Sequence, residues 1–591
     1  MGGDQEFVLA REAQVYSGAY QTFSAPLSLP AHRQTIPELP ATTLPLFGAA
    51  RAGVDREHEV IVADTSTSAR RYEHSAAAFC GGSIWSLDWC PHQANNDALY
   101  LAVAAHPKAR DRNVIGHVIE GPVLLQIWRV ASLDVAEVDS AAAAPVGAHP
   151  GPGGQHEEGV CQSQGDGAGE RVVESDSGVA RLEGTTSSAS ELPSMVLGIC
   201  LTGGVVWDCK WRPGSGAHDR LGTLAAVLGS GEVQLLSVPH PDHLDSAAEA
   251  ADSEGAPTPV SRGLPGGPSA PRFVRLRPQA TAAASTVSGS LPSVVEWLPS
   301  APHDLLLAGY WDGSVAMWRL ATGGDAAAQK GPEQAVCLEL LLHMPALDGP
   351  VRGLAWAPRE VATAAGDLAH RNLFVTVGHS SKLRFWDARN AFSPMLEAPV
   401  SNRWKMGVEW VADPLGIIVA EDNGVVRWVD LNPFDRTARM SHNSNITGGQ
   451  QTMWDVHWQP GGGRIAYAGA DGEVAVVRLE RDLPNQPNIA IAGFRLEGGG
   501  VLSVLDRADL AGRARLNAGA KAQPRMSVAQ EAIHTVRWSS AAPQPHATHA
   551  EGGHPGLPSV IGRKGRGLGK EWPPAWLACG GAAGVLLILR C

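Results

Sequence analysis

Three arginines could contact phosphates from one short segment of this 591-residue chain. The run Phe273-Val274-Arg275-Leu276-Arg277 alternates basic and apolar residues, as a strand with one solvated face does. Arginine neutralises phosphates but carries no base-sequence information at such contacts. We therefore predict a nucleic-acid or partner contact here, with a solvated strand face as the alternative, at Arg272, Arg275 and Arg277.

A second basic cluster lies in a glycine-rich stretch and is made by Arg563, Lys564, Arg566 and Lys570. The stretch resembles a phosphate-binding loop, but no glycine stands five positions before Gly569-Lys570, and Glu571 replaces the required Ser or Thr. We predict a basic loop that contacts nucleic acid or a partner, with a flexible solvated loop as the alternative.

Polar side chains recur immediately before a tryptophan, at Asp88, Glu296, Glu409 and His457, and two more acids, Asp208 and Asp455, occupy another equivalent position. A hydrolase would need such groups to converge. Ion pairing or packing of polar groups around the core is the interpretation we favour.

Motifs of other catalytic and metal sites fail their tests. His546, His549 and His554 have no cysteine or acidic cluster beside them, and no Gly-x-Ser-x-Gly elbow occurs. The sequence therefore predicts a protein that is not an enzyme and has no cofactor, no metal and no catalytic residue.

The abundance of tryptophan is explained by a repeat. The chain has 18 Trp but only 6 Tyr and 10 Phe. The clearest copy runs from Val294-Val295-Glu296-Trp297-Leu298-Pro299 through 305–309 and Asp312-Gly313 to 315–320. Its alternation has the period of a strand, and Asp-Gly supplies the positive φ of a tight hairpin.

Seven such copies follow one another along the chain. Repetition of a three-strand unit with a weaker outer strand predicts an all-β fold, a seven-bladed WD40-type β-propeller with disordered acidic insertions. We expect the repeated tryptophans to pack between neighbouring blades. They are Trp89, Trp211, Trp297, Trp356, Trp410, Trp458 and Trp538.

The chain divides into a propeller over 81–591 and an N-terminal extension over 1–80, part of which is β-prone. Three insertions interrupt the propeller: an acidic low-complexity segment at 131–195, a Pro/Ala/Ser-rich segment at 239–290, and a loop at 541–572 in the last blade. A strand from 1–80 or from 480–530 must complete the ring, and the sequence does not decide between them.

Charge and targeting signals restrict the class of protein. Residues 131–195 carry a net charge of −9 and residues 241–262 a net charge of −4, which together equal the −13 of the whole chain, so the remainder is nearly neutral and compatible with a nucleic-acid partner. The first residues lack the basic and apolar parts of a signal peptide, and no uninterrupted apolar run is long enough to span a membrane. The eight cysteines lack paired spacing, which favours a reducing compartment and no membrane partner.

The first copies resemble one family, the WD-repeat subunit of general transcription factor TFIIIC (the general transcription factor 3C polypeptide 2 family). The resemblance lies in 81–91, which reads Gly-Gly-Ser-Ile-Trp-Ser-Leu-Asp-Trp-Cys-Pro, in 204–213, in the Pro239-His240-Pro241 exit, and in 307–313. It covers about residues 80–480 and extends more loosely to the end.

The resemblance implies a nuclear, non-catalytic scaffold subunit of TFIIIC, which supports internal-promoter recognition and RNA polymerase III initiation on tRNA and related genes. It implies other TFIIIC subunits as partners, including a second propeller subunit. Members commonly carry a long charged N-terminal extension linked to DNA contact, whereas about 80 residues without a basic run precede the first copy here. We therefore expect indirect or weak promoter contact. The alternative is a WD40 adaptor that reads a peptide or chromatin partner.

Overall fold

The computed structural model describes residues 7–9, 47, 49–51, 76–91, 98–107, 116–131, 192–244, 271–322, 336–358, 372–398, 400–412, 415–431, 443–448, 451–459, 463–478, 490–497, 501–505, 532–539 and 575–590. Their regular structure is almost entirely β, with two short 3-10 turns at Pro241–His243 and Ala284–Thr286. No helix in these ranges has the length and apolar character needed to cross a bilayer.

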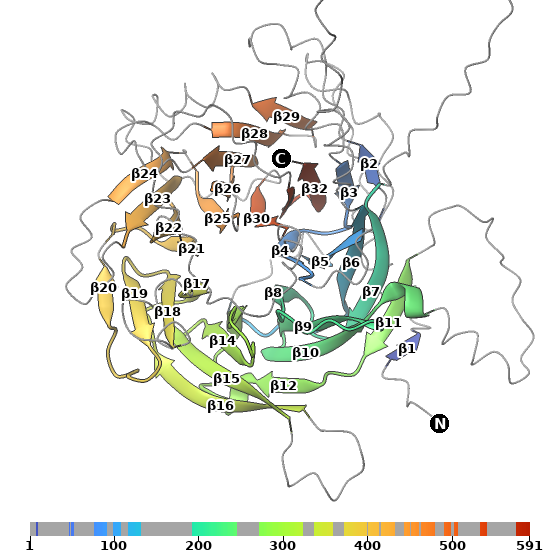
Figure 1. Cartoon of the computed structure of the whole chain (residues 1–591), viewed down its shortest axis with the longest axis horizontal. Coiled ribbons are helices and arrows are strands. Elements are labelled where there is room, and N and C mark those ends of the chain that lie inside the picture. Colours follow the sequence, from blue (N-terminus) through green and yellow to red (C-terminus); the bar gives the residue numbers. More distant parts are fainter. Residues whose placement is uncertain are drawn as a thin grey trace, which may run out of the picture. The chain divides into compact units, whose positions relative to one another are not determined.

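Seven sheets stand around a central channel as the blades of a propeller, which confirms the predicted fold (Figure 1). The strands of each blade are given from the centre outwards. Blade 1 consists of β4 (Ile84–Trp89), β5 (Ala98–Ala105), β6 (Val123–Ala131), β7 (Ser194–Leu201), β11 (Arg272–Leu276) and β1 (Phe7–Leu9), and blade 2 of β8 (Val206–Trp211), β9 (Arg220–Leu228), β10 (Glu232–Pro239) and β12 (Ala280–Ala283). Blade 3 consists of β13 (Pro292–Trp297), β14 (Leu305–Tyr310), β15 (Ser314–Thr322) and β16 (Val336–Pro345), and blade 4 of β17 (Val351–Trp356), β18 (Leu373–Gly378), β19 (Leu383–Asp387) and β20 (Leu396–Ala398).

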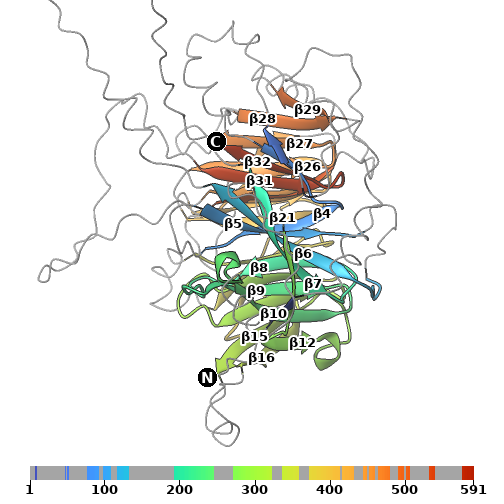
Figure 2. The same ribbon diagram turned by 90° about the vertical axis from the view of Figure 1, so that its right-hand side faces the viewer.

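The remaining three blades follow the same order. Blade 5 consists of β21 (Lys405–Val411), β22 (Gly416–Glu421), β23 (Val425–Asp430) and β24 (Asn443–Gly448). Blade 6 consists of β25 (Met453–Trp458), β26 (Arg464–Gly469), β27 (Glu473–Arg478), β28 (Ala490–Glu497) and β29 (Val501–Leu505). Blade 7 consists of β30 (Ile533–Trp538), β31 (Trp576–Gly581), β32 (Val585–Arg590), β3 (Ala76–Phe79) and β2 (Ala49–Arg51). Figure 2 shows the same ring from the side.

The N-terminal region closes the ring. β3 pairs antiparallel with β32, from Ala76 opposite Ile588 to Phe79 opposite Val585, and the amide of Cys80 donates to the carbonyl of Gly584 at 2.8 Å. The residues from 490 onwards instead form the outer strands β28 and β29 of blade 6. Of the two segments that the sequence left open, 1–80 therefore supplies the closing strand, and blade 7 includes residues before position 81.

Predicted insertions and observed strands differ at the edges. The range 239–290 contains β11 and β12, which add to blades 1 and 2, and β7 begins at Ser194, inside the range 131–195. β11 lies parallel to β7, the only parallel pairing among the described strands. The middle of both ranges, and the whole of 541–572, lie outside the described residues, so their disorder and their independence from the fold stay predictions.

Apolar side chains fill the space between consecutive blades. Ile417 and Val419 of blade 5, for example, pack with Phe385 of blade 4, and all three are essentially buried. Buried apolar area of this kind is the main stabilising contribution in a fold whose single sheets cannot bury both faces. The predicted positive φ of the Asp-Gly turn is confirmed at Gly313, where φ is 87° and a side chain would collide with the carbonyl oxygen of Leu347.

Candidate functional site in the central channel

A β-bulge at the same place in every inner strand determines which side chains line the channel. In β4 the pairing register shifts between Ile84 and Ser86, and in β17 it shifts between Val351 and Gly353. The corresponding shift occurs in the inner strands of the other five blades. Because a bulge adds one residue to the strand, the bulged residue turns to the same side as the residue that follows it. Three positions of each inner strand therefore line the channel.

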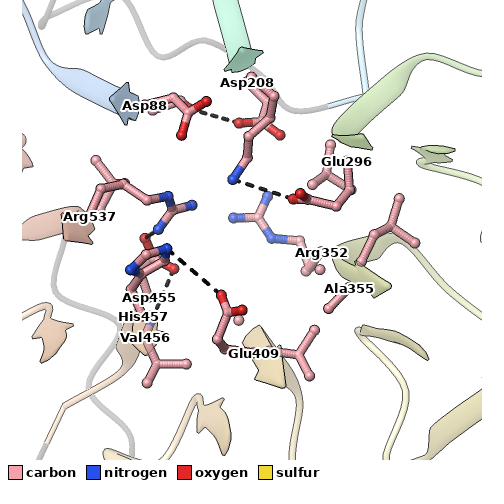
Figure 3. Close-up of a pocket in the computed structure, with 18 of the residues that line it drawn as sticks. Asp88, Asp208, Glu296, Arg352, Ala355, Glu409, Asp455, Val456, His457 and Arg537 are labelled. Carbon is pink, nitrogen blue, oxygen red and sulfur yellow. Dashed lines mark hydrogen bonds and ion pairs between the residues drawn. The ribbon is translucent and has the colours of Figure 1, made fainter. Parts of the chain in front are cut away.

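These positions form three rings, counted back from the repeated tryptophan of each blade. The entry ring lies four residues before this tryptophan and consists of Trp85, Trp207, Ser293, Arg352, Met406, Trp454 and His534. The middle ring lies three residues before it and consists of Ser86, Asp208, Val294, Gly353, Gly407, Asp455 and Thr535. The inner ring lies one residue before it and consists of Asp88, Lys210, Glu296, Ala355, Glu409, His457 and Arg537. All of them line one cavity of about 410 Å³. Figure 3 shows inner-ring side chains from several blades pointing into this cavity.

The middle ring braces blades 1 to 2, 2 to 3, and 6 to 7. Asp208 accepts hydrogen bonds from Ser86 Oγ at 2.7 Å and from the Val295 amide at 2.9 Å. Asp455 accepts from the Val536 amide at 3.1 Å and pairs with the guanidinium of Arg537. Such bonds satisfy buried backbone donors of the next blade, so these carboxylates are structural braces.

The inner ring makes a second set of braces on the same blades. Asp88 Oδ2 accepts from the Trp211 amide at 2.7 Å, and His457 Nδ1 accepts from the Trp538 amide at 3.2 Å. In blades 3 to 5 the ring reads Glu296, Ala355 and Glu409.

The two glutamates of the inner ring are less firmly held. Glu296 Oε2 pairs with Lys210 Nζ at 3.4 Å. Glu409 Oε2 lies 4.0 Å from His457 Nε2, which is a charged pair only if the imidazole is protonated. Burial holds the pKa of His457 well below its usual range, so it is neutral at neutral pH.

The channel carries more acid than base. Five carboxylates (Asp88, Asp208, Glu296, Glu409 and Asp455) face three cations (Lys210, Arg352 and Arg537). Burial, and then the charge of Glu296, raise the pKa of Glu409 to about 8, and burial raises that of Asp88 to about 6. Burial opposes the charge of Lys210, but the neighbouring carboxylates, led by Glu296, raise its pKa above the usual value.

Aromatic side chains fill the entry end of the channel, where the inner strands begin. Trp85 stacks on His534, with ring centroids 4.5 Å apart, and on His106 at 5.4 Å. Trp207 and Trp454 meet Trp85 edge-on. Burial lowers the pKa of His106 to about 3 and that of His534 to about 4, so both rings pack as neutral aromatic groups.

The repeated tryptophans link each blade to the one before it. The indole N–H of Trp89 donates to the carbonyl of Arg537 at 3.0 Å, which joins blade 1 to blade 7 across the closure. Trp211, Trp297, Trp356 and Trp410 make the same bond to the inner-ring residue of the preceding blade, at 3.1–3.3 Å. Trp538 is buried, but its indole N–H has no partner among the described residues, and Trp458 is only partly buried.

The predicted basic contacts separate into two cases. Arg275 lies in β11 and Arg277 directly follows this strand; both are exposed, and Val274 and Leu276 are buried between blades. Arg272 is partly buried and belongs to the opposite parity of the strand. The second cluster, Arg563, Lys564, Arg566 and Lys570, lies outside the described residues, so its role stays a prediction.

The acids that the sequence singled out do converge on the channel, but its three basic residues Lys210, Arg352 and Arg537 were missed. Lys210 and Arg537 precede Trp211 and Trp538, so the position that revealed the acids would also have revealed these bases. Arg352 belongs to the entry ring, whose orientation depends on the bulge and has no local sequence signal. Within the described ranges, no group of three or more His, Cys, Asp or Glu residues has a geometry that could hold a metal ion.

The fold and the channel define a seven-bladed WD40-type propeller with a charged central cavity. No protein-family model matches the chain. The chain is 24% identical over 400 residues to "General transcription factor 3C polypeptide 2" of Homo sapiens and, equally, to that of Pongo abelii. Each alignment covers 64% of this chain and 35% of the relative, so the chain spans about a third of the length of these curated relatives. The resemblance to this family is thus confirmed.

Two weaker likenesses accompany it. A segment of 104 residues, 17% of this chain, is 29% identical to "Protein transport protein SEC31 homolog B" of Arabidopsis thaliana and covers 9% of that protein. Among solved structures, Sqt1 of Saccharomyces cerevisiae superposes with a TM-score of 0.41 and 10% identity, over 86% of this chain and 96% of that one.

Proposed function

We propose that this chain is a non-catalytic scaffold subunit of a TFIIIC-type transcription factor in the nucleus. The observation that carries the proposal is the 24% identity to general transcription factor 3C polypeptide 2, which extends over 400 residues and 64% of this chain. A closed propeller suits the role because it presents rigid loops on two faces, while most of its channel acids serve as braces.

Its partners in this proposal are the other TFIIIC subunits, including a second propeller subunit. Through them the chain supports recognition of internal promoters and initiation by RNA polymerase III on tRNA and related genes. Promoter DNA is contacted indirectly or weakly, with Arg275 and Arg277 as the described candidates for phosphate contact. Contacts of this kind would add affinity that falls with salt and does not depend on base sequence.

Affinity purification tests the assembly role. The tagged protein is isolated gently from its own cells, and its partners are identified by mass spectrometry. We expect a second propeller subunit together with large TFIIIC subunits. Ubiquitin-ligase or histone-modifying components in their place would overturn the proposal and support the adaptor alternative.

A charge-reversal variant tests the DNA contact. Arg275→Glu with Arg277→Glu should weaken binding of the purified complex to promoter DNA and to unrelated DNA alike, and should flatten its salt dependence. Arg389→Glu is the matched control, since Arg389 is an exposed arginine on blade 4 that pairs with Asp387. Unchanged affinity of the double variant would remove β11 from the list of DNA contacts.

A further inference from the structure

The inner ring has one position without a functional side chain, and two carboxylates flank it. Blade 4 contributes Ala355, whereas the six other blades contribute a charged residue or histidine. In Figure 3 Ala355 lies between Glu296 and Glu409, whose carboxylates point into the cavity. These side chains keep 30% and 32% of their surface exposed, against 13% for Lys210, so the cavity gives access to them.

The charge of the channel favours an added cation at the position of Ala355, between Glu296 and Glu409, which we call the notch. Five carboxylates face three cations, and the structure describes one ion pair for Glu409, a long one to the neutral His457. Excess negative charge in a partly dehydrated cavity is unfavourable unless a proton or a cation offsets it. Among the described residues, Glu409 has no cation within ion-pair distance, although the charges of Lys210 and Arg537 act on it from farther away.

The exit end of the channel, where the inner strands end, offers the shorter way in. The entry end is occupied by the mutually packed Trp85, Trp207, Trp454, His106 and His534. The inner ring lies close to the exit end, where Pro91, Pro213 and Pro299 also line the cavity. A side chain that enters there reaches Glu296 and Glu409 without passing Arg352.

Six buried polar atoms of cavity-lining residues have no hydrogen-bond partner among the described residues: Trp311 Nε1, Arg352 Nε, Trp454 Nε1, Thr535 Oγ1, Arg537 Nε and Trp538 Nε1. Native structures rarely leave such groups unpaired. Five of the six are N–H donors, which the backbone carbonyls of an inserted segment can satisfy, whereas a guanidinium has donors only.

We propose that the channel binds the guanidinium of an arginine side chain from a partner protein, inserted from the exit face and seated over Ala355 between Glu296 and Glu409. A planar guanidinium has five donors and can bridge two carboxylates. An extended segment with a protruding arginine fits the cavity of about 410 Å³, which is in the size range of specific ligand sites. The inference is independent of the complex proposed above.

A peptide titration with the purified full chain tests the site. The probes are acetyl-Gly-Arg-Gly-amide and its citrulline analogue, which has nearly the same shape but no charge. We expect the arginine peptide to bind and the citrulline peptide to bind at least about tenfold more weakly, because charge-assisted bonds are lost. Equal binding of the two peptides, or no binding of the arginine peptide in calorimetry and ligand-observed NMR, would overturn the proposal.

Variants of the chain locate the site. Ala355→Arg supplies the missing cation from within and should abolish binding, while Glu409→Gln, which changes only charge, should weaken it at least about tenfold. Arg319→Ala, at an exposed pair with Glu339 on blade 3, is the control and should leave affinity unchanged. If Ala355→Arg fails to fold by circular dichroism, Glu409→Gln decides. Wild-type affinity in Glu409→Gln contradicts the proposed site.

Discussion

The channel wall made by blades 6, 7, 1 and 2 differs from the wall made by blades 3, 4 and 5. On the first wall, the middle ring supplies Ser86, Asp208 and Asp455 as braces between blades. On the second wall the middle ring is reduced to Val294, Gly353 and Gly407.

The braced wall contains the closure of the ring, where the N-terminal strand β3 pairs with the C-terminal strand β32 in blade 7 and residues 80–83 lead on into β4 of blade 1. There the indole of Trp89 reaches Arg537, and His534 Nδ1 donates to the carbonyl of Ile84 at 3.1 Å. The difference teaches that polar braces gather around the non-covalent closure. On the opposite wall, made by blades 3, 4 and 5, the middle-ring residues are small and leave room for a ligand.

The largest expected effect is on the braced wall, at Arg537. Arg537→Met removes the cation that faces Asp455 and leaves a buried carboxylate without its partner. We expect a loss of about 3–5 kcal/mol in the free energy of unfolding, measured by urea denaturation. The control Arg319→Met breaks an exposed pair and should leave the free energy of unfolding close to that of wild type. Similar losses in the two variants would show that the channel pair is no brace.

A smaller loss is expected at the middle ring, where the two walls can be compared at one position. Asp208→Ala leaves the Ser86 hydroxyl and the Val295 amide without their acceptor, which should cost about 2–3 kcal/mol. In Gly407→Ala on blade 5, the new Cβ would lie no closer than 3.4 Å to Asp455, an ordinary contact. That variant should stay within about 1 kcal/mol of wild type. A reversed order in urea denaturation would break the comparison.

The stability of the wall made by blades 3, 4 and 5 should depend on pH because of Glu409. Its pKa is about 8 in the folded chain, against an ordinary value of 4.5. Below pH 4.5 the carboxyl is protonated in both states, and as pH rises towards 8 only the unfolded chain releases the proton, so the native state loses stability. Glu409→Gln cannot ionise and should gain about 1–2 kcal/mol over wild type by pH 8, since water in the channel screens the group. Melting curves at acidic and alkaline pH check this, and parallel curves would contradict it.

The smallest expected effect concerns the repeated tryptophans. Trp89→Phe keeps most of the ring but removes the bond to the carbonyl of Arg537, which should cost about 1 kcal/mol more than Trp538→Phe, whose indole N–H has no described partner. Both sites are buried, so the changes in packing are comparable. Equal free energies of unfolding for the two variants would mean that the indole bond adds nothing to the closure.

The three-strand core of every blade could be predicted from sequence because its signals are local. The Trp-x-Pro exits, the alternation and turns such as Asp312-Gly313 all lie within one repeat. The additions to the blades could not be predicted, since β11 pairs in parallel with β7 from another part of the chain. The closing strand reads Ala76-Ala77-Ala78-Phe79, and alanine has weak β-propensity, so these residues do not favour 1–80 over 480–530 as the source of the closing strand.

The candidate site could be predicted only in part. The acids before the tryptophans were visible because the repeat aligns them, and Lys210 and Arg537 follow the same rule. Ala355 is recognised as the notch of the inner ring only when the seven inner strands are placed around one axis. Which residues form the entry ring depends on the β-bulges, and no single residue type in the sequence predicts the geometry of a bulge.

The pairing of β3 with β32 has a consequence for the synthesis of the protein on the ribosome. About 500 residues separate the two strands, and at about 5–20 residues per second the edge of β3 waits roughly 25–100 s for its partner to be made. Through that interval an unpaired strand edge is available to other nascent chains, so the last blade is the step of biogenesis at which a chaperone would matter most.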